Sequence, residues 1–186
     1  RQPYGRYPWH FEYREEDHDD GEKTFLGESG NLNGEDIIDI VVQQPATARF
    51  ICRHLYNFFV ADEPQVPSWT IEPARDEEAL DAMMTTFEEN NYEIKPLLRM
   101  MFNSDFFKNA RFSKIKSPAE VVAGTLKMVE EFQFPEPGIL QIGKEPSYMG
   151  QAILDPPSVE GWHTGTEWIN SGSLLARVNF VADRVA

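Results

Sequence analysis

Apolar residues recur at every third or fourth position along most of the chain, which is the spacing of one buried helical face. This pattern predicts helices over 35–44, 45–61, 76–90, 93–107, 117–132 and 173–186, with a short one over 147–154. Strand signals are sparse. The sequence therefore predicts a mostly α fold with little or no sheet.

The apolar positions also predict which face of each helix turns inward. In the second, third and fourth helices these residues are Ala48, Ile51, Leu55, Phe58 and Phe59; Leu80, Met83, Met84 and Phe87; and Leu97, Leu98, Met101 and Phe102. In the closing helix, Leu174, Leu175, Val178 and Val181 share one face.

Three helix starts carry recognisable signals. Asn33 is a good N-cap, and Glu35 and Asp36 follow in the first turn, where the helix dipole favours anions. Pro45 fits the first turn of the next helix. The clearest start is "SPAE", in which Ser117 caps, Pro118 takes the first helical position and Glu120 completes a capping box.

We expect residues 1–186 to form a single helical domain with long ordered loops rich in Gly, Pro and Trp. It divides into an aromatic strap and acidic glycine-rich loop (1–33), a helical core (34–132), and a long loop with a closing helix (133–186). Prolines make the linker 62–73 irregular, and the stretch 133–146 should also break regular structure.

Composition is that of a folded, acidic protein. Of the 186 residues, 41% are hydrophobic, and the net charge of −14 argues against nucleic acid as a partner. No apolar run approaches the roughly 20 residues that span a bilayer. Charge is uneven: the stretch 62–93 has ten acidic residues and one basic one, whereas 106–119 has four basic and no acidic ones. Such runs are typical of solvated faces that neutralise each other.

The stretch "EEDHDDGEK" is the first candidate site. It matches a calcium-binding loop only in part, because Glu22 occupies the position where that loop needs glycine. A looser divalent metal site could use His18 with Asp19 or Asp20, with a third ligand from His10 or His54. The alternative is a structural loop, in which Asp19, Asp20 and Glu22 accept hydrogen bonds from backbone N–H groups and pair with Lys23 or a neighbouring arginine.

The loop "GWHTGTEWIN" is the second candidate. Trp162 and Trp168, with His163 and Asn170, could form an aromatic platform with polar edges for a sugar or a peptide. In the alternative reading, which we favour, both indole rings hold a long loop onto the helices. Elsewhere, His54 and Cys52 are interpreted as structural residues.

Three blocks of the chain resemble one protein family. The blocks are "HDDGEKTFLGESGNLNGEDIIDIVVQQPATARFICRHLYNFFV", "YEIKPLLRMMFNSDFF" with "KIKSPAEVVAGTLK", and "MGQAILDPPSVEGWHTGTEWINSGSLLARVNF". In order and wording they are similar to the bacterial DUF1800 family. The resemblance covers nearly all of residues 10–186. The matching motif residues are His18, Asp19, Gly21, Lys23, Leu26 and Gly27, whereas His163 stands where family members commonly have proline.

The resemblance implies a mostly helical fold, a bacterial origin and no assigned activity. It also implies that this chain is the C-terminal part of a longer protein. Members often carry export signals, so we expect a periplasmic, cell-surface or secreted location. Expected partners are other protein chains, either the N-terminal part of the same protein or a neighbour similar to sulfatases and phosphatases. Gly21, Lys23 and Gly27 are then parts of a structural motif.

Three hypotheses on function follow. The first is a structural or assembly module of an exported or cell-surface complex, because no catalytic constellation is visible. The second is a metal-assisted hydrolase or sugar-processing fragment that uses His18, Asp19 and Asp20. The third is a carbohydrate- or peptide-binding module built on the tryptophan loop. Whether the protein is an enzyme is left open, and a divalent metal is the one cofactor considered.

Overall fold

The computed structural model describes residues 13–132, 134–162 and 164–185. It divides into two compact units, Arg1–Thr47 and Ala48–Ala186. Most of the predicted aromatic strap, with Tyr4, Tyr7, Trp9 and Phe11, lies outside the described residues, whereas Tyr13 is described and is exposed. The assignment of all 186 residues to one domain stays a prediction.

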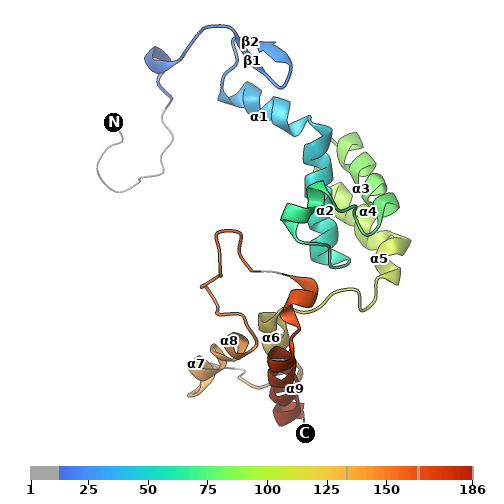
Figure 1. Cartoon of the computed structure of the whole chain (residues 1–186), viewed down its shortest axis with the longest axis vertical. Helices are drawn as coiled ribbons and strands as arrows, with labels where there is room; N and C mark the ends of the chain where they lie inside the picture. Colours follow the sequence, from blue (N-terminus) through green and yellow to red (C-terminus); the bar gives the residue numbers. More distant parts are fainter. Residues whose placement is uncertain (1–12, 133, 163, 186) are drawn as a thin grey trace. The chain divides into compact units, whose positions relative to one another are not determined.

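The fold is mostly α, as predicted (Figure 1). The helices are α1 (Gly34–Val42), α2 (Pro45–Phe59), α3 (Glu77–Glu89), α4 (Ile94–Asn103), α5 (Asp105–Asn109), α6 (Pro118–Met128), α7 (Ile139–Ile142), α8 (Glu145–Tyr148) and α9 (Ser171–Val185). Short 3₁₀ helices cover Glu15–Asp17, Val66–Thr70 and Gly165–Trp168. Within the described ranges, the sheet is a single antiparallel hairpin of β1 (Lys23–Phe25) and β2 (Glu28–Gly30).

In the first unit, the hairpin turns through Leu26 and Gly27. Both have positive φ angles, 49° and 93°, as a tight hairpin turn of two residues requires. The chain then enters α1 through Asn33, whose side chain accepts hydrogen bonds from the backbone of Glu35 and Asp36. In return, the Asp36 carboxylate accepts a hydrogen bond from the Asn33 N–H, which completes a capping box. The predicted cap is confirmed.

In the second unit, α2, α3, α4 and α5 enclose the main core. Its buried members are Ala48, Cys52, Tyr56, Val60, Ala61, Ala79, Leu80, Met83, Phe87, Leu97 and Met101. Most predicted inward residues lie here, but the prediction was wrong for Phe58 and Phe102, which are 70% and 40% exposed. At 3.6 residues per turn, Phe58 lies about one third of a turn away from the buried Cys52. The helix therefore points it away from the core.

The predicted helix over 93–107 is two helices. Ser104 has a ψ of 157°, which ends α4, and its hydroxyl accepts a hydrogen bond from the Phe107 N–H to begin α5. The break arises because a serine can satisfy the first free N–H groups of a new helix with its own side chain.

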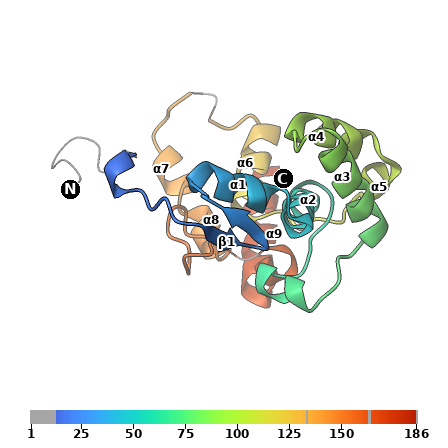
Figure 2. The same cartoon turned by 90° about the horizontal axis from the view of Figure 1, so that it is seen from above.

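The helices α6, α8 and α9 contact one another and form a second, smaller core of Val122, Met149 and Phe180 (Figures 1 and 2). The predicted capping box of Ser117 and Glu120 is confirmed.

Three expectations for this region were wrong. The helix from Ser117 ends at Met128 instead of continuing to residue 132. The stretch 133–146 holds two short helices, α7 and the start of α8. The short helix predicted over 147–154 is instead Glu145–Tyr148, because Gly150 turns the chain with a φ of 100°. Across the described part of the chain, none of the helices combines the length and apolar character that crossing a membrane requires.

Candidate functional site

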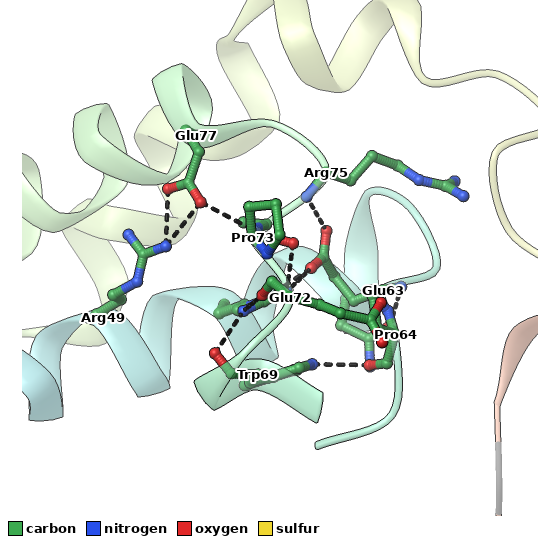
Figure 3. Close-up of polar contacts among 11 residues, drawn as sticks. Arg49, Glu63, Pro64, Trp69, Glu72, Pro73, Arg75 and Glu77 are labelled. Atoms are coloured by element: carbon green, nitrogen blue, oxygen red, sulfur yellow. Dashed lines mark hydrogen bonds and ion pairs between the residues drawn. The ribbon is translucent and has the colours of Figure 1, made fainter. Parts of the chain in front are cut away.

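A buried ion pair organises the irregular segment between α2 and α3. Arg53 of α2 donates from Nε to Oε2 of Glu63 at 2.8 Å, and the two side chains are 3% and 0% exposed. The guanidinium also donates from Nη1 to the carbonyl groups of Glu72 (3.1 Å) and Trp69 (3.4 Å), and from Nη2 to that of Pro73 (2.9 Å). One arginine therefore holds three separate backbone positions between α2 and α3, a segment that forms only a short 3₁₀ helix. Figure 3 draws Trp69, Glu72 and Pro73 with the dashed hydrogen bonds of this segment.

Glu63 completes this arrangement from the other side. Its Oε1 accepts a hydrogen bond from the Arg75 N–H at 2.8 Å, while its own N–H donates to the side chain of Asn57. The indole N–H of Trp69 donates to the Pro64 carbonyl at 2.7 Å. We call Arg53, Glu63 and the backbone that they hold the Arg53–Glu63 clamp. Buried charges need such complete pairing, since an unpaired one is very costly.

The outer side of this segment borders a cleft of about 630 Å³. Its lining comes from residues 62–65, Ser68 and 72–75 on one side and from 164–167 on the other. The two sides touch directly: Gln65 donates to the Thr164 carbonyl at 3.3 Å, and Gly165 packs on Asp62. A side chain at position 165 would place its Cβ 3.1 Å from that of Asp62, and the φ of 65° also disfavours one, so glycine suits this close approach. Figure 3 shows the Arg75 side chain extending away from the clamp.

Aromatic rings cover the clamp next to α2. His54 lies between Phe50 and Trp69, with ring centroids 4.4 and 4.6 Å away. The Arg53 guanidinium carbon lies 4.7 Å from the Trp69 ring centroid. Burial lowers the pKa of His54, because a charged imidazole loses hydration there. This histidine is packed as a neutral aromatic side chain, in keeping with its structural interpretation.

The loop over residues 161–170, which we call the tryptophan loop, is joined at its C-terminal end to the start of α9. Trp168 is only 8% exposed, and its carbonyl accepts a hydrogen bond from the Ser173 hydroxyl at 2.8 Å. Asn170 accepts from the Ser173 N–H at 2.9 Å, which caps the start of the helix. Trp162 is partly exposed, and His163 lies outside the described residues. The burial of Trp168 suits the reading in which the indole holds the loop, and ligand binding by Trp162, Trp168 and Asn170 stays a prediction.

The acidic loop in the first unit contains several local contacts. His18 Nδ1 lies 2.9 Å from Oδ1 of Asp20, and the Gly21 N–H donates to Oδ1 of Asp19 at 2.9 Å. The Lys23 ammonium donates to the carbonyl groups of Asp19 and Gly21. Hydrogen bonds from His18 and then Asn31 hold the pKa of Asp20 below its usual value. These contacts close the loop on itself beside the hairpin.

The same side chains were the predicted metal ligands. Both carboxylates already make hydrogen bonds within the loop. Asp19 accepts one from the Gly21 N–H, and Asp20 shares one with the His18 ring. In the part of the chain that the structure describes, no group of three His, Cys, Asp or Glu side chains is placed to hold a metal ion. His10 lies outside that part, and His54 packs against the rings of Phe50 and Trp69. A metal at His18, Asp19 and Asp20 stays a prediction.

Comparison with known proteins gives one match. The family model described as a protein of unknown function, DUF1800, matches residues 5–185. The chain belongs to the DUF1800 family. This confirms the resemblance seen in the three sequence blocks, and it assigns no activity to the family. No curated protein and no solved structure matches the chain.

Sequence reasoning missed the Arg53–Glu63 clamp of this DUF1800 protein. The available signal was an arginine next to Cys52 on the apolar face of α2, four residues after Arg49 and three before Tyr56. A charged residue on such a face requires a buried partner, but the sequence does not say which of ten acidic residues in 62–93 supplies it.

Proposed function

We propose that this DUF1800 chain is a structural or assembly module that docks onto another protein chain in an exported or cell-surface bacterial complex. The expected partner is the remainder of the same polypeptide or a neighbour similar to sulfatases and phosphatases. The single observation that carries this proposal is the exposed apolar face of α9, a helix that already packs on its other side.

One side of α9 is buried against α6 and α8, and there Ser173, Arg177 and Phe180 are at most 8% exposed. The other side, which we call the α9 face, consists of Leu174, Leu175, Val178 and Val185, which are 47–61% exposed. A shallow groove of about 620 Å³ runs along it past Val181 and Ala182. A helix that packs on one side and leaves a row of apolar side chains exposed on the other is typical of one that a partner covers.

The surroundings of α9 strengthen this reading. The core that α9 shares with α6 and α8 has three buried hydrophobic residues. Several large apolar side chains from the end of α6 to the start of α9 are also exposed to solvent. The exposed fractions are highest for Met128 (75%), Leu140 (84%), Leu154 (92%) and Val159 (106%). Apolar area left in water contributes nothing to folding. Contact with another protein would bury it.

Site-specific photo-crosslinking tests the proposal in the organism that makes the protein. A photoreactive amino acid at Val178 should give one discrete crosslinked product with another chain. The matched control places the same group at Asp183, which is exposed on the same helix but outside the α9 face. The double variant Leu175→Glu with Val178→Glu should fold normally and lose the partner when the complex is purified.

Two results would contradict the assembly function. One is the absence of a product at position 178. The other is an equal product at position 183, which would indicate random encounter. Circular dichroism and a melting curve on the double variant establish that its fold is intact, since both replaced side chains are more than half exposed.

The cleft beside the Arg53–Glu63 clamp favours a second candidate function, a carbohydrate- or peptide-binding module. Its volume falls within the range of small-ligand sites, and one of its walls is fixed from behind by buried hydrogen bonds. Polar groups of Gln65, Ser68 and Thr166 border the cleft.

Titration with oligosaccharides and short peptides tests this candidate through the intrinsic tryptophan fluorescence, because Trp168 ends the 3₁₀ helix that forms one wall. A saturable signal that is lost in Thr166→Arg, which fills the cleft, would support it. A signal that persists in this variant would exclude the cleft as its source.

A further inference from the structure

Four phenylalanine rings form a continuous edge-to-face series on the second unit. We call Phe58, Phe59, Phe102 and Phe107 the phenylalanine ladder. Successive ring centroids lie 4.7, 5.2 and 5.1 Å apart, with interplanar angles of 81°, 80° and 78°. The rings come from the C-terminal ends of α2 and α4 and from α5.

Core packing explains only part of this ladder. Phe59 and Phe107 pack against the main core and are partly buried. Phe58 is 70% exposed and Phe102 is 40% exposed, so much of their apolar area faces water. Edge-to-face contact favours such ring pairs, but an exposed ring gains little from burial. Joined exposed rings are typical of surfaces that contact a partner, whereas isolated exposed hydrophobic residues are ordinary.

Cations lie at two points along the ladder. The Lys114 ammonium donates to the carbonyl of Asn57, the residue before Phe58, at 2.6 Å. The Lys108 ammonium donates to the carbonyl of Asn103, the residue after Phe102. Lys114 also contacts the Asp62 carboxylate at 3.1 Å, and Lys108 lies 3.8 Å from the carboxylate of the exposed Asp105.

The surrounding segment is the basic stretch 106–119, which carries four basic and no acidic side chains in a chain of net charge −14. Arg111 and Lys116 are exposed on it. The same stretch displays Phe112, which is fully exposed with a φ of 62°. The turn that carries it is fixed, because Asp62 donates its N–H to the Ser113 carbonyl at 3.2 Å. The stretch 106–119 therefore combines basic side chains with the aromatic rings of Phe107 and Phe112.

We propose that the phenylalanine ladder, with Lys108 and Lys114 beside it, binds a short amphipathic peptide segment of a partner protein that carries acidic side chains next to apolar ones. The apolar side chains would cover Phe58 and Phe102, and the carboxylates would meet the two ammonium groups. This deepens the assembly function by naming partner chemistry, but it uses different residues from the α9 face, so each proposal can fail alone.

A short peptide fits these charges better than an anionic membrane does. Exposed charges act over roughly 8 Å at physiological salt, so a peptide on the ladder responds mainly to the nearby lysines. A bilayer extends over the molecule and also meets the acidic stretch 62–93, with its ten carboxylates. Self-association is disfavoured too, since two ladders would bring lysines of like charge together.

The test uses the 186-residue chain and a fluorescein-labelled helical peptide that has Leu and Phe on one face and Glu beside them. Its twin has Gln in place of every Glu. Fluorescence anisotropy should show ~10-fold tighter binding of the Glu peptide, and added salt should remove most of this difference.

Four variants locate the binding. Phe58→Ala and Lys108→Glu should each weaken the Glu peptide by ~5-fold or more. Phe50→Ala is the matched aromatic control, because Phe50 is 51% exposed on the same helix but outside the ladder. Lys127→Glu is the charge control on α6. Both controls should change binding by less than ~2-fold.

Several outcomes would overturn the proposal. They are no binding of the Glu peptide, equal binding of the two peptides, or equal effects of the ladder variants and their controls. Cosedimentation with phosphatidylglycerol-containing vesicles that is lost in Phe58→Ala, without peptide binding, would assign the ladder to a membrane instead. None of these outcomes bears on crosslinking at Val178, so the assembly function is judged separately.

Discussion

Glu63 accepts hydrogen bonds from two directions, from Arg53 Nε on Oε2 and from the Arg75 N–H on Oε1, each at 2.8 Å. Its carboxylate therefore ties helix α2 to the chain that leads into α3. The segment between them includes the wall of the cleft. Its shape depends on this one side chain more than on local propensity, since the intervening residues form only a short 3₁₀ helix.

Breaking the clamp should destabilise the protein strongly. Arg53→Met leaves the Glu63 carboxylate buried without its counter-charge, and Glu63→Gln leaves the Arg53 guanidinium buried without its own. Each change should lower the free energy of unfolding by about 3–5 kcal/mol. Urea denaturation measures this loss. The double variant Arg53→Met with Glu63→Leu should lose less than the sum of the two single changes, because no charge then remains unpaired.

The exposed pair of Arg49 and Glu77 is the matched control for the clamp. Its side chains are 39% and 44% exposed, so Arg49→Met should cost at most about 1 kcal/mol. If Arg49→Met and Arg53→Met cost the same, burial would not be what makes the Arg53–Glu63 pair important.

Gly165→Ala should separate the two walls of the cleft. The residue has a φ of 65°, and a Cβ there would meet Asp62 at 3.1 Å, so we expect a loss of about 1–2 kcal/mol. Gly124→Ala is the control within α6, where a Cβ has nothing within 4 Å. It should stabilise the protein by about 0.5–1 kcal/mol, as alanine does inside a helix. Equal effects in urea denaturation would contradict this explanation of Gly165.

His54 should make stability depend on pH. Burial lowers its pKa in the folded protein, so the unfolded chain binds a proton more readily as the pH falls below 6.5. The contribution of the neutral imidazole to the free energy of unfolding is therefore fully present above pH 6.5, and it is lost as the pH falls below that value. The melting temperature of His54→Phe should fall less than that of the wild type between about pH 7.5 and pH 5.5. Parallel curves for the two proteins would contradict the prediction.

The acidic loop should be structural. In His18→Ala with Asp19→Ala, the contacts to Asp20 and to the Gly21 N–H are removed, so amide hydrogen exchange in 19–31 should accelerate. Elemental analysis of both proteins should find less than one equivalent of divalent metal. An equivalent in the wild type that is lost in the variant would establish a metal site and favour the hydrolase hypothesis.

Local signals were the most reliable guide to the fold. The caps at Asn33 and Ser117 were predicted and are confirmed, because a cap joins a side chain to backbone only two or three residues away. Helix ends without such signals were harder to place. The end of α6 at Met128 carries no side-chain cap. The break at Ser104 does carry one, but it lies inside a continuous apolar pattern that predicts a single helix.

Which apolar residues lie inside was predicted less well. Leu80, Met83, Leu97 and Met101 are buried as expected, but Phe58 and Phe102 form the exposed end and middle of the phenylalanine ladder. Periodicity identifies an apolar face, and a helix whose face is wider than its contact leaves some of it in water. Likewise, Leu174, Leu175 and Val178 share a face of α9 as predicted, but the opposite face is the buried one.

By itself, the sequence determined the helical character of this DUF1800 protein, the positions of its main capped helices and its family, since these rest on spacing and motifs within short stretches. Only the tertiary structure decided that Arg53 pairs with Glu63, that Gly165 packs on Asp62, and that Lys108 and Lys114 lie beside the ladder. The physical reason is that burial and pairing depend on which distant segments meet. In a chain with many carboxylates, nothing local distinguishes the one that becomes buried.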